Sequence, residues 1–155
     1  GLGDVYKRQV KLKASQKIPA APRPQIQKTR YLMMKMIHTD NAPGAIGPYS
    51  QGFIVGDLVY TSGQIPVNPA DGSIPEGIAA QAAQSCKNVL AILEAAGSGA
   101  EKVVKTTCFL ANMEDFAAFN EEYAKYFTSK PARSCVAVKS LPKNVLCEIE
   151  AIAEA

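Results

Sequence analysis

The chain has 155 residues, of which 47% are hydrophobic and 20% charged, a composition typical of a globular protein with one domain. No window approaches the ~18 consecutive apolar residues that a membrane helix needs. The formal net charge is +3, but residues 1–36 carry nine Lys or Arg against one acid, whereas residues 37–155 carry eight bases and thirteen acids. The acidic remainder argues against a broad phosphate-binding surface, so any contact with nucleic acid is expected from the N-terminal segment.

The N-terminal segment, residues 1–36, contains three prolines and no sustained apolar period, so we expect it to be largely disordered. It is either a basic targeting leader or a remnant of cloning or gene assembly that precedes a start at Met33, Met34 or Met36. It lacks the apolar stretch of roughly 7–15 residues of a secretory signal. We therefore expect one cytoplasmic domain, residues 37–155, and leave organelle targeting by the tail open.

From residue 37 the pattern becomes regular, and the order of elements is strand, strand, helix, strand, helix, strand, strand. Helical spacing of apolar residues indicates the two helices, and β-branched alternation indicates the strands. The strands are expected over 51–55, 58–65, 102–111, 134–138 and 146–153, and the helices over 78–96 and 112–127. In the third strand, Val104, Thr106, Cys108 and Leu110 are expected on one face.

This order favours an α+β sandwich, in which one mixed sheet carries both helices on one face. The strands have apolar residues on both sides, as with Phe109 beside Leu110 and Ile149 near Ile152. A monomer would expose the second face to water, so we expect self-association through the sheet.

The four cysteines are unpromising as a metal site. Cys86, Cys108, Cys135 and Cys147 form no CxxC motif, and the single histidine, His38, has no ligand partner at a useful spacing. We expect reduced thiols, most of them small buried hydrophobes in strands. A Cys-His pair is not excluded by spacing, although His38 lies at the very start of the folded part.

Polar residues at strand ends are the candidates for chemistry. Arg133 is the only arginine after residue 36 and comes just before a strand, where it either clamps a carboxylate in two-point geometry or pairs with Glu148 or Glu150. Those two acids share one face of an otherwise apolar strand, so they must meet water, a cation or a ligand. Gly63, placed in a strand, signals a bulge or a close approach, and Tyr49 lies in a Gly/Pro-framed turn.

Seven separated segments, in this order and spacing, resemble the RidA family, also called the YjgF family. The resemblance covers about residues 37–155, and its most specific motifs are "PARS" and "EIEA". The seven segments are "AIGPYSQG", "YTSGQIPVNP", "AAQSCKNVLAILEAAG", "VVKTTCFL", "FAAFNEEYAKYF", "PARSCVAV" and "EIEAIA".

The resemblance implies a chorismate-mutase-like fold and a homotrimer with a central β-barrel, whose active sites lie between subunits. It implies hydrolysis of 2-imino acids or their enamine tautomers, such as 2-aminoacrylate, 2-iminopropanoate and 2-iminobutanoate, to 2-keto acids and ammonia, without cofactor or metal. Membrane and nucleic-acid partners are not expected. Translation-inhibiting endoribonuclease activity or chaperone-like binding, described for other members, is the alternative.

The resemblance also assigns roles to residues of this chain. Arg133 would clamp the substrate carboxylate, helped by the backbone N–H of Cys135, and Glu148 would position or activate the attacking water. Tyr49 and the Gly63 backbone would line the pocket, and Asn120 would border it. Two departures affect the cleft: the link from Ser129 to Pro131 is shorter than in many members, and Cys147 precedes "EIEA" where other members vary.

Overall fold

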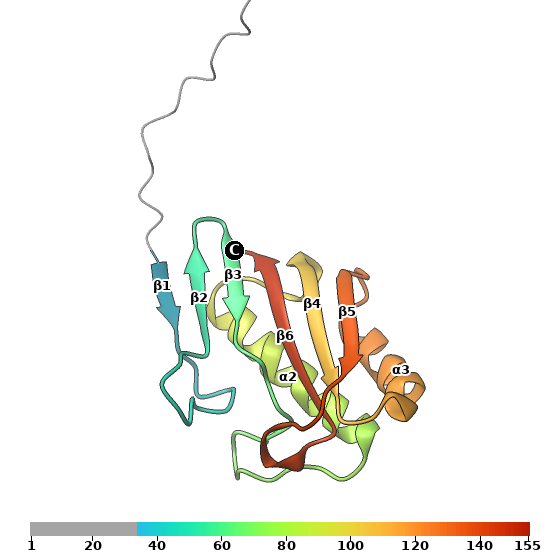
Figure 1. The fold of residues 1–155 in the computed structure, drawn as a ribbon. Helices are drawn as coiled ribbons and strands as arrows, with labels where there is room; N and C mark the ends of the chain where they lie inside the picture. The colour runs from blue at the N-terminus through green and yellow to red at the C-terminus, as the bar shows by residue number, and fades with distance from the viewer. Residues whose placement is uncertain (1–33) are drawn as a thin grey trace, which may run out of the picture. The chain divides into compact units, whose positions relative to one another are not determined.

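The computed structural model describes residues 34–155, which build one six-stranded sheet with two helices against it (Figure 1). The strand order is β1-β2-β3-β6-β4-β5, and only the β4–β5 pair is parallel. The strands are β1 Met34–Ile37, β2 Gly52–Val55, β3 Leu58–Thr61, β4 Val103–Leu110, β5 Ala132–Ala137 and β6 Cys147–Glu154, and the helices are α2 Ile78–Ala95 and α3 Phe116–Tyr126. The predicted α+β class with one mixed sheet is confirmed.

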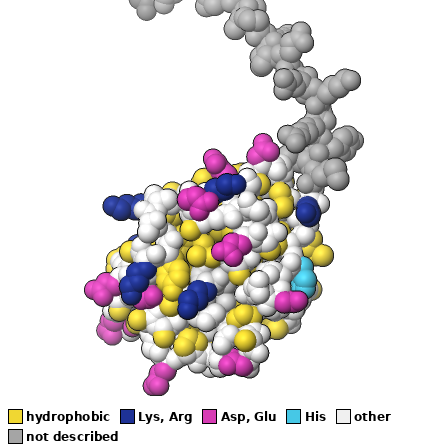
Figure 2. Space-filling view, turned by 180° about the vertical axis from the view of Figure 1, so that it is seen from behind, with side chains coloured by type: hydrophobic (Ala, Val, Ile, Leu, Met, Phe, Trp, Pro, Cys, Tyr) yellow, Lys and Arg dark blue, Asp and Glu magenta, His cyan; other side chains and the backbone are white. Residues whose placement is uncertain are grey.

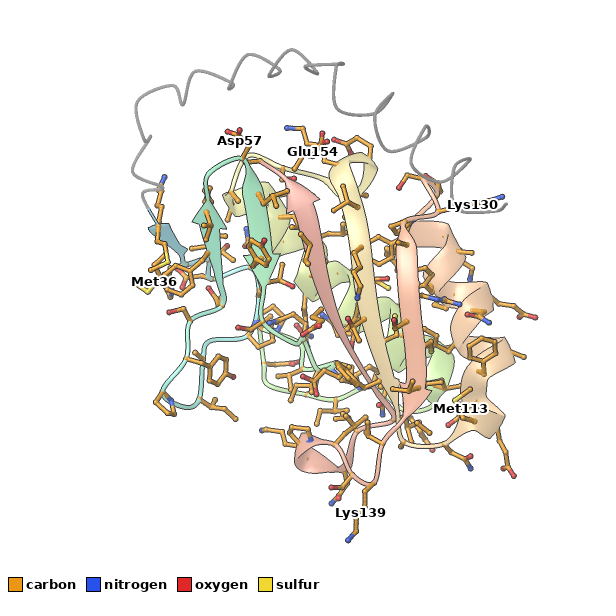
Figure 3. The ribbon with its side chains drawn as sticks, turned by 45° about the horizontal axis from the view of Figure 1, so that its top comes forward. Met36, Asp57, Met113, Lys130, Lys139 and Glu154 are labelled. Atoms are coloured by element: carbon orange, nitrogen blue, oxygen red, sulfur yellow. The ribbon has the colours of Figure 1, made fainter. Side chains whose placement is uncertain are left out.

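β1 is the element that the sequence did not predict. It pairs with β2 from Met34↔Val55 to Ile37↔Gly52, and it forms the sheet edge at which Figure 3 labels Met36. Residues 34–36 therefore belong to the sheet rather than to the expected disordered segment, whose remainder, residues 1–33, lies outside the described part of the chain. Only Ile37 of this strand is buried, which explains why hydrophobic patterning gave no signal.

The predicted hairpin is present, but its second strand is shorter than expected. Gly56 adopts a φ of 63° in the turn, a conformation that glycine tolerates without steric cost. β3 ends at Thr61 rather than at residue 65, and Gln64 then makes an isolated bridge to Ile149 of β6. Gly63 thus lies in an irregular segment held against β6.

Helix α2 matches its prediction closely because its apolar residues recur at helical spacing. Its buried face includes Ala82, Val89 and Leu93. The helix ends before Gly97, which has a φ of 79°, and the N–H groups of Gly97 and Ser98 donate to the last turn at 2.9 Å each. This arrangement satisfies carbonyl groups that a helix end would otherwise leave unpaired.

A β-bulge in β4 places one residue on the face opposite to the predicted one. Between Val103 and Lys105 the register of β4 against β6 shifts, so Val103 is buried with Thr106, whereas Val104 is 43% exposed. The alternation of the sequence predicts Val104 on the face of Thr106, and this prediction is wrong. A bulge inserts one residue and reverses the alternation locally.

The hydrophobic core lies between the sheet and the two helices, which cover the far side of the sheet in Figure 1. Phe119 and Phe127 are among its largest side chains. The opposite face of the sheet has no cover in the described chain and exposes Tyr60 and Val136 by 41% and 46%. Viewed from behind, the described surface intersperses acidic and basic side chains (Figure 2). Neither helix in residues 34–155 has the length and apolar character needed to cross a membrane.

Candidate active site

A cleft of ≈ 590 Å³ opens beside the start of β6 and is lined by Glu148 and Glu150. Both acids lie on the uncovered sheet face, because Cys147, Ile149 and Ala151 alternate with them and are buried in the core. The predicted sharing of one strand face by the two acids is confirmed. The cleft walls also include two other predicted site residues, Tyr49 from the loop before β2 and Gly63 from the segment after β3.

Gly63 leaves the space that the Glu148 carboxylate occupies. A Cβ built at position 63 would overlap Glu148 Oε1 and would lie 2.8 Å from Glu148 Cδ. The next residue, Gln64, exchanges two backbone hydrogen bonds with Ile149, at 2.8 and 3.2 Å. These hydrogen bonds fix the backbone of residues 63 and 64 against β6. The close approach predicted at Gly63 is present, and it is made by the Glu148 side chain.

The electrostatic surroundings of Glu148 favour its protonated form. Partial burial, and to a smaller extent the neighbouring charge of Glu150, raise the pKa of Glu148. Removal from water penalises the ionised carboxyl, and a like charge nearby acts in the same direction. A carboxylate with a raised pKa is a better proton acceptor, so Glu148 is suited to general-base chemistry.

Hydrogen bonds from the buried Gln51 side chain hold the loop that carries Tyr49. The Gln51 side chain is 3% exposed, and its Nε2 donates to the carbonyl oxygens of Ala42 and Pro43 at 3.2 and 2.9 Å. Tyr49 itself is half exposed, and its hydroxyl accepts a hydrogen bond from the backbone N–H of Ile46 at 3.5 Å. The loop thereby holds the phenol at the rim of the cleft.

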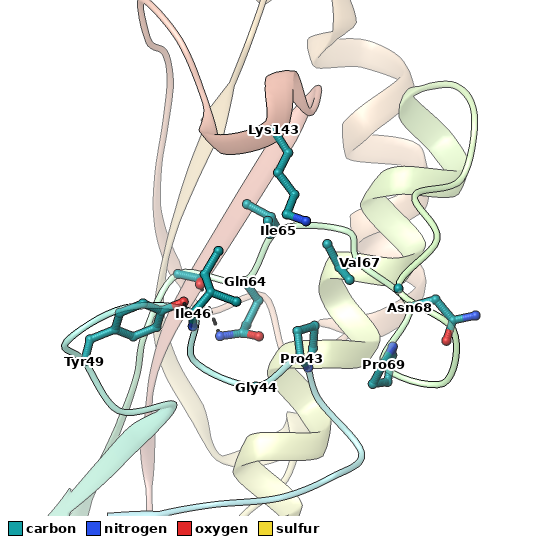
Figure 4. A pocket seen from close by; sticks show the side chains of 12 residues that line it. Pro43, Gly44, Ile46, Tyr49, Gln64, Ile65, Val67, Asn68, Pro69 and Lys143 are labelled. Carbon is teal, nitrogen blue, oxygen red and sulfur yellow. Dashed lines mark hydrogen bonds between the residues drawn. The ribbon is translucent and has the colours of Figure 1, made fainter.

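A second cavity, of ≈ 230 Å³, adjoins the cleft and shares four lining residues with it: Ile46, Tyr49, Gly63 and Ile65. Figure 4 shows its walls, with the Lys143 side chain reaching toward Ile65 and Val67 from the opposite rim. Its lining is largely apolar apart from Gln64, Asn68 and this lysine. The Glu148 cleft therefore has an apolar extension.

Arg133 and Asn120 line a different pocket, of ≈ 480 Å³, between α3 and β5. The Arg133 guanidinium carbon lies 4.8 Å from the ring centroid of Tyr123 and 5.7 Å from that of Phe116. Asn120 Oδ1 is buried and accepts no hydrogen bond within the described chain. This pocket thus presents a cation and an unpaired acceptor together.

The two groups of candidate residues occupy opposite faces of the sheet. Arg133 pairs in register with Thr106, which points into the core, whereas Glu148 pairs with Phe109 on the uncovered face. Strand β4 separates their strands. Within residues 34–155, Arg133 contacts neither Glu148 nor Glu150, so of the two interpretations left open, the structural ion pair is absent.

The cysteine thiols are unsuited to nucleophilic chemistry. Cys86, Cys108 and Cys147 are buried, and Cys135 on β5 is partly buried. Burial raises the pKa of all four thiols, to about 12 for Cys108 and Cys147, so they stay protonated near neutral pH. His38 is exposed and lies 3.6 Å from Asp40.

Sequence reasoning missed three residues that shape these pockets. Gln51 anchors the Tyr49 loop, and Phe116 and Tyr123 lie under Arg133. An aromatic stripe at helical spacing is typical of core packing, which explains why a role for this pair was not recognised. The spacing of seven positions along α3, with Asn120 between them, places them on one helix stripe, and this stripe ends beside the "PARS" segment.

Comparison with known proteins gives a consistent result. A family model described as endoribonuclease L-PSP matches residues 39–155. A RutC family protein of Haemophilus influenzae is 56% identical over 127 residues, covering 79% of this chain and 98% of that protein. A 2-iminobutanoate/2-iminopropanoate deaminase of Escherichia coli is 55% identical over 125 residues, with 78% and 98% coverage. A crystal structure of Escherichia coli TdcF with bound serine superposes with a TM-score of 0.76 at 50% identity, covering 78% of this chain and 98% of that one.

Proposed function

Because the chain belongs to the RidA family, which the endoribonuclease L-PSP model describes, we propose that it hydrolyses 2-imino acids to 2-keto acids and ammonia. Its substrates are 2-aminoacrylate, through its imine tautomer 2-iminopropanoate, and 2-iminobutanoate. The observation that carries the proposal is the Glu148 cleft, where a carboxylate of raised pKa faces Tyr49 and Gly63. The E. coli relative that is 55% identical bears the name of this activity.

Glu148 acts on a water molecule. Its carboxylate accepts a proton while the water oxygen bonds to C2 of the imine and the C=N π electrons move to nitrogen. The protonated Glu148 then returns the proton to the nitrogen of the tetrahedral adduct. Glu148 next takes the proton of the adduct's hydroxyl and passes it to the amino nitrogen, so that the C–N bond breaks, ammonia leaves and the C=O bond of the keto acid forms. An imine carbon is already electrophilic, so positioning one water and one base suffices without a covalent intermediate.

Arg133 holds the substrate carboxylate. A guanidinium presents paired N–H donors that match a carboxylate in two-point geometry, and charge-assisted bonds of this kind are the strong ones. The backbone N–H of Cys135 adds a donor, and Asn120, whose Oδ1 is unpaired in the described chain, borders the substrate. The clamp fixes C2 relative to the attacking water.

A complete site combines Arg133 of one copy with Glu148 of a neighbour in a homotrimer with a central β-barrel. Two observations support this arrangement. Arg133 and Glu148 are on opposite sheet faces, so one chain alone does not direct both at one small molecule. The uncovered face also exposes apolar side chains such as Tyr60 and Val136, a surface that assembly would bury.

The test couples a pyridoxal-phosphate-dependent dehydratase to this protein and follows ammonia and keto-acid release from 2-aminoacrylate. We expect release to be faster than in buffer and in proportion to the protein added. The matched control is Glu148→Gln, which keeps the shape of the side chain and removes the base. An intact wild-type oligomer that does not accelerate release would refute the proposal.

The same preparation tests for ribonuclease activity, the alternative that the description of the family model names. Ribonuclease activity is expected to be absent, because the region from residue 37 onward carries thirteen acids and eight bases and so offers little attraction for phosphates. RNA cleavage that Glu148→Gln leaves unchanged, together with no imine hydrolysis, would favour the alternative.

A further inference from the structure

The side chain of Arg133 rests on aromatic rings rather than on acids. Its guanidinium carbon is 4.8 Å from the Tyr123 ring centroid and 5.7 Å from that of Phe116. Both distances are within the ≈ 6 Å over which a cation is attracted to a ring face. Arg133 contacts no carboxylate among the described residues, so its position depends on α3.

The nearer ring, that of Tyr123, is held by a hydroxyl contact and by packing against a second ring. The Tyr123 hydroxyl lies 2.7 Å from Thr106 Oγ1, a buried contact. Its ring also packs against that of Phe127, with centroids 4.7 Å apart. Thr106 is the register partner of Arg133 in the neighbouring strand. Strand β4, which pairs with Arg133, and the Tyr123 ring, which lies against it, are therefore joined by the contact between the hydroxyls of Thr106 and Tyr123.

Among residues 34–155, this support leaves the hydrogen-bonding edge of the arginine free. A ring face attracts a guanidinium through its flat side, whereas the five N–H donors lie in the guanidinium plane. A supporting carboxylate would instead use those donors. Arg133 and Tyr123 both line the ≈ 480 Å³ pocket, so the free donors have access to a ligand there.

We propose that Tyr123 is a positioning residue for Arg133: its ring, flanked by that of Phe116, holds the guanidinium flat so that its N–H edge meets the substrate carboxylate. This inference rests on the proposed function and adds residues that the resemblance did not assign. Tyr123 acts through Arg133 and does not touch the substrate.

The test uses Tyr123→Leu, which removes the ring, and Tyr123→Phe, which keeps it. Tyr126→Leu is the matched control, because it makes the same change on the same helix at a side chain without a contact to Arg133. Tyr123→Leu is expected to raise KM for the imine and Kd for 2-oxobutanoate about tenfold, with kcat changed less than about twofold. Tyr126→Leu is expected to stay within about twofold of wild type in both constants, whereas Tyr123→Phe, which keeps the ring but loses the hydroxyl contact with Thr106, is expected to raise them less than Tyr123→Leu does.

A double-mutant cycle shows whether Tyr123 acts through Arg133. In an Arg133→Ala background, Tyr123→Leu is expected to cause no additional loss of 2-oxobutanoate affinity. If it causes the same loss as in the wild-type background, or if Tyr123→Leu lowers only the melting temperature, the inference is wrong. Should Tyr123→Leu fail to fold, Phe116→Leu replaces it, with an expected rise in KM of about threefold.

One readout does not depend on catalysis. In the wild-type protein, the NMR resonance of the Arg133 Nε–H group is expected to be shifted upfield by the rings, and Tyr123→Leu to remove most of that shift, whereas Tyr126→Leu keeps it. An unshifted wild-type resonance overturns the inference. A shifted resonance in a protein that hydrolyses no imine overturns the proposed function and leaves the positioning of Arg133 established.

Discussion

At the scale of single residues, the two charged groups proposed for catalysis are supported in different ways. Glu148 is partly buried and has no cation partner in the described chain, and its pKa is raised by burial and by Glu150. Arg133 is exposed and rests on the rings of Tyr123 and Phe116. Each group therefore keeps its hydrogen-bonding capacity for a ligand rather than for the other.

Replacing Arg133 is expected to be severe even when the charge is kept. Arg133→Ala should lower kcat/KM for 2-iminobutanoate roughly 10²–10³-fold, because a charge-assisted, two-point contact to the carboxylate is lost. Arg133→Lys should lower it nearly as much, since an ammonium offers no planar pair of donors. Steady-state kinetics of both variants measures this.

The control for the arginine variants is Lys139→Ala, which removes a positive charge just beyond the other end of β5 (Figure 3). It should keep kcat/KM within about twofold of wild type. If Arg133→Lys behaves like this control, a general positive charge rather than a fork of donors holds the substrate.

Glu148→Gln is expected to abolish turnover and to stabilise the fold at neutral pH. A carboxyl whose pKa is raised on folding contributes stability only while it is protonated, and this contribution is lost as the pH rises through its folded pKa. Glutamine mimics the protonated form at every pH. The melting temperature of the variant should exceed that of wild type at pH 7 and converge with it as the pH falls below the raised pKa.

Thermal unfolding of Glu148→Gln and wild type between pH 4 and pH 8 measures this difference. The kcat/KM of wild type should fall as the pH decreases through the same pKa, because a protonated Glu148 accepts no proton from water. A melting-temperature difference that grows toward acid pH would contradict the assignment of a raised pKa.

At the scale of elements, prediction from sequence succeeded where periodicity was strong. Helix α2 was placed within one residue because its apolar stripe is continuous, and the β6 faces were assigned correctly because alternation runs through Cys147–Glu154. β1 was missed because only Ile37 is buried. The face of Val104 was wrong because a bulge depends on the pairing of β4 with β6, which no local pattern records.

Sequence patterns and motif resemblance named the candidate residues, whereas most of their arrangement required the structure. Glycine inside a strand-like run indicated a bulge or a close approach, and the structure shows Glu148 as the side chain that approaches. Motif resemblance assigned Tyr49 to the same pocket, whose walls it shares with Gly63. That Arg133 faces α3 while Glu148 faces away follows from the registers of β5 and β6 on β4, in which Arg133 pairs with Thr106 and Glu148 with Phe109. These registers join segments distant in the chain, so single-sequence patterns do not determine them.

The position of β1 leads to a prediction about N-terminal truncation. We propose that residues 1–33 are dispensable, so their deletion should leave the melting temperature and imine hydrolysis unchanged. Deleting residues 1–37 removes β1 and the buried Ile37, which is 5% exposed and packs close to Gly52. Loss of this buried side chain should lower the melting temperature by about 5 °C or more.

Differential scanning fluorimetry of the two truncated proteins and the full chain measures this. The shorter deletion serves as the control for the longer one. A loss of activity on removing residues 1–33 would show that the segment takes part in the function.

At the scale of the whole molecule, the placement of the two charged groups determines how a site is completed. Arg133 and Glu148 lie on opposite faces of one sheet, with β4 between their strands. The uncovered face, with Tyr60 and Val136 exposed, gives a second copy an apolar surface to contact. In the proposed trimer each chain thus contributes to two different sites.

Mixing two inactive variants tests this sharing directly. Equal amounts of Arg133→Ala and Glu148→Gln subunits, unfolded together and refolded, should regain about one quarter of the wild-type rate. About three quarters of randomly assembled trimers contain both variants, and each of these has one intact site of three. Each variant refolded alone should stay inactive. The coupled ammonia assay measures the recovery, and a mixture as inactive as its components would show that each chain supplies both groups to its own site.

Because Arg133 and Glu148 lie on opposite faces of the sheet, the rate of hydrolysis is also expected to depend on protein concentration. If a lone chain presents either the acid or the guanidinium to a given substrate, the rate per chain depends on the fraction of the protein that is assembled. Dilution below the dissociation constant of the assembly would then stop hydrolysis without unfolding the chain. A newly made chain would then be inactive until it assembled with other copies. The reaction would begin only above a threshold concentration of the protein in the cell.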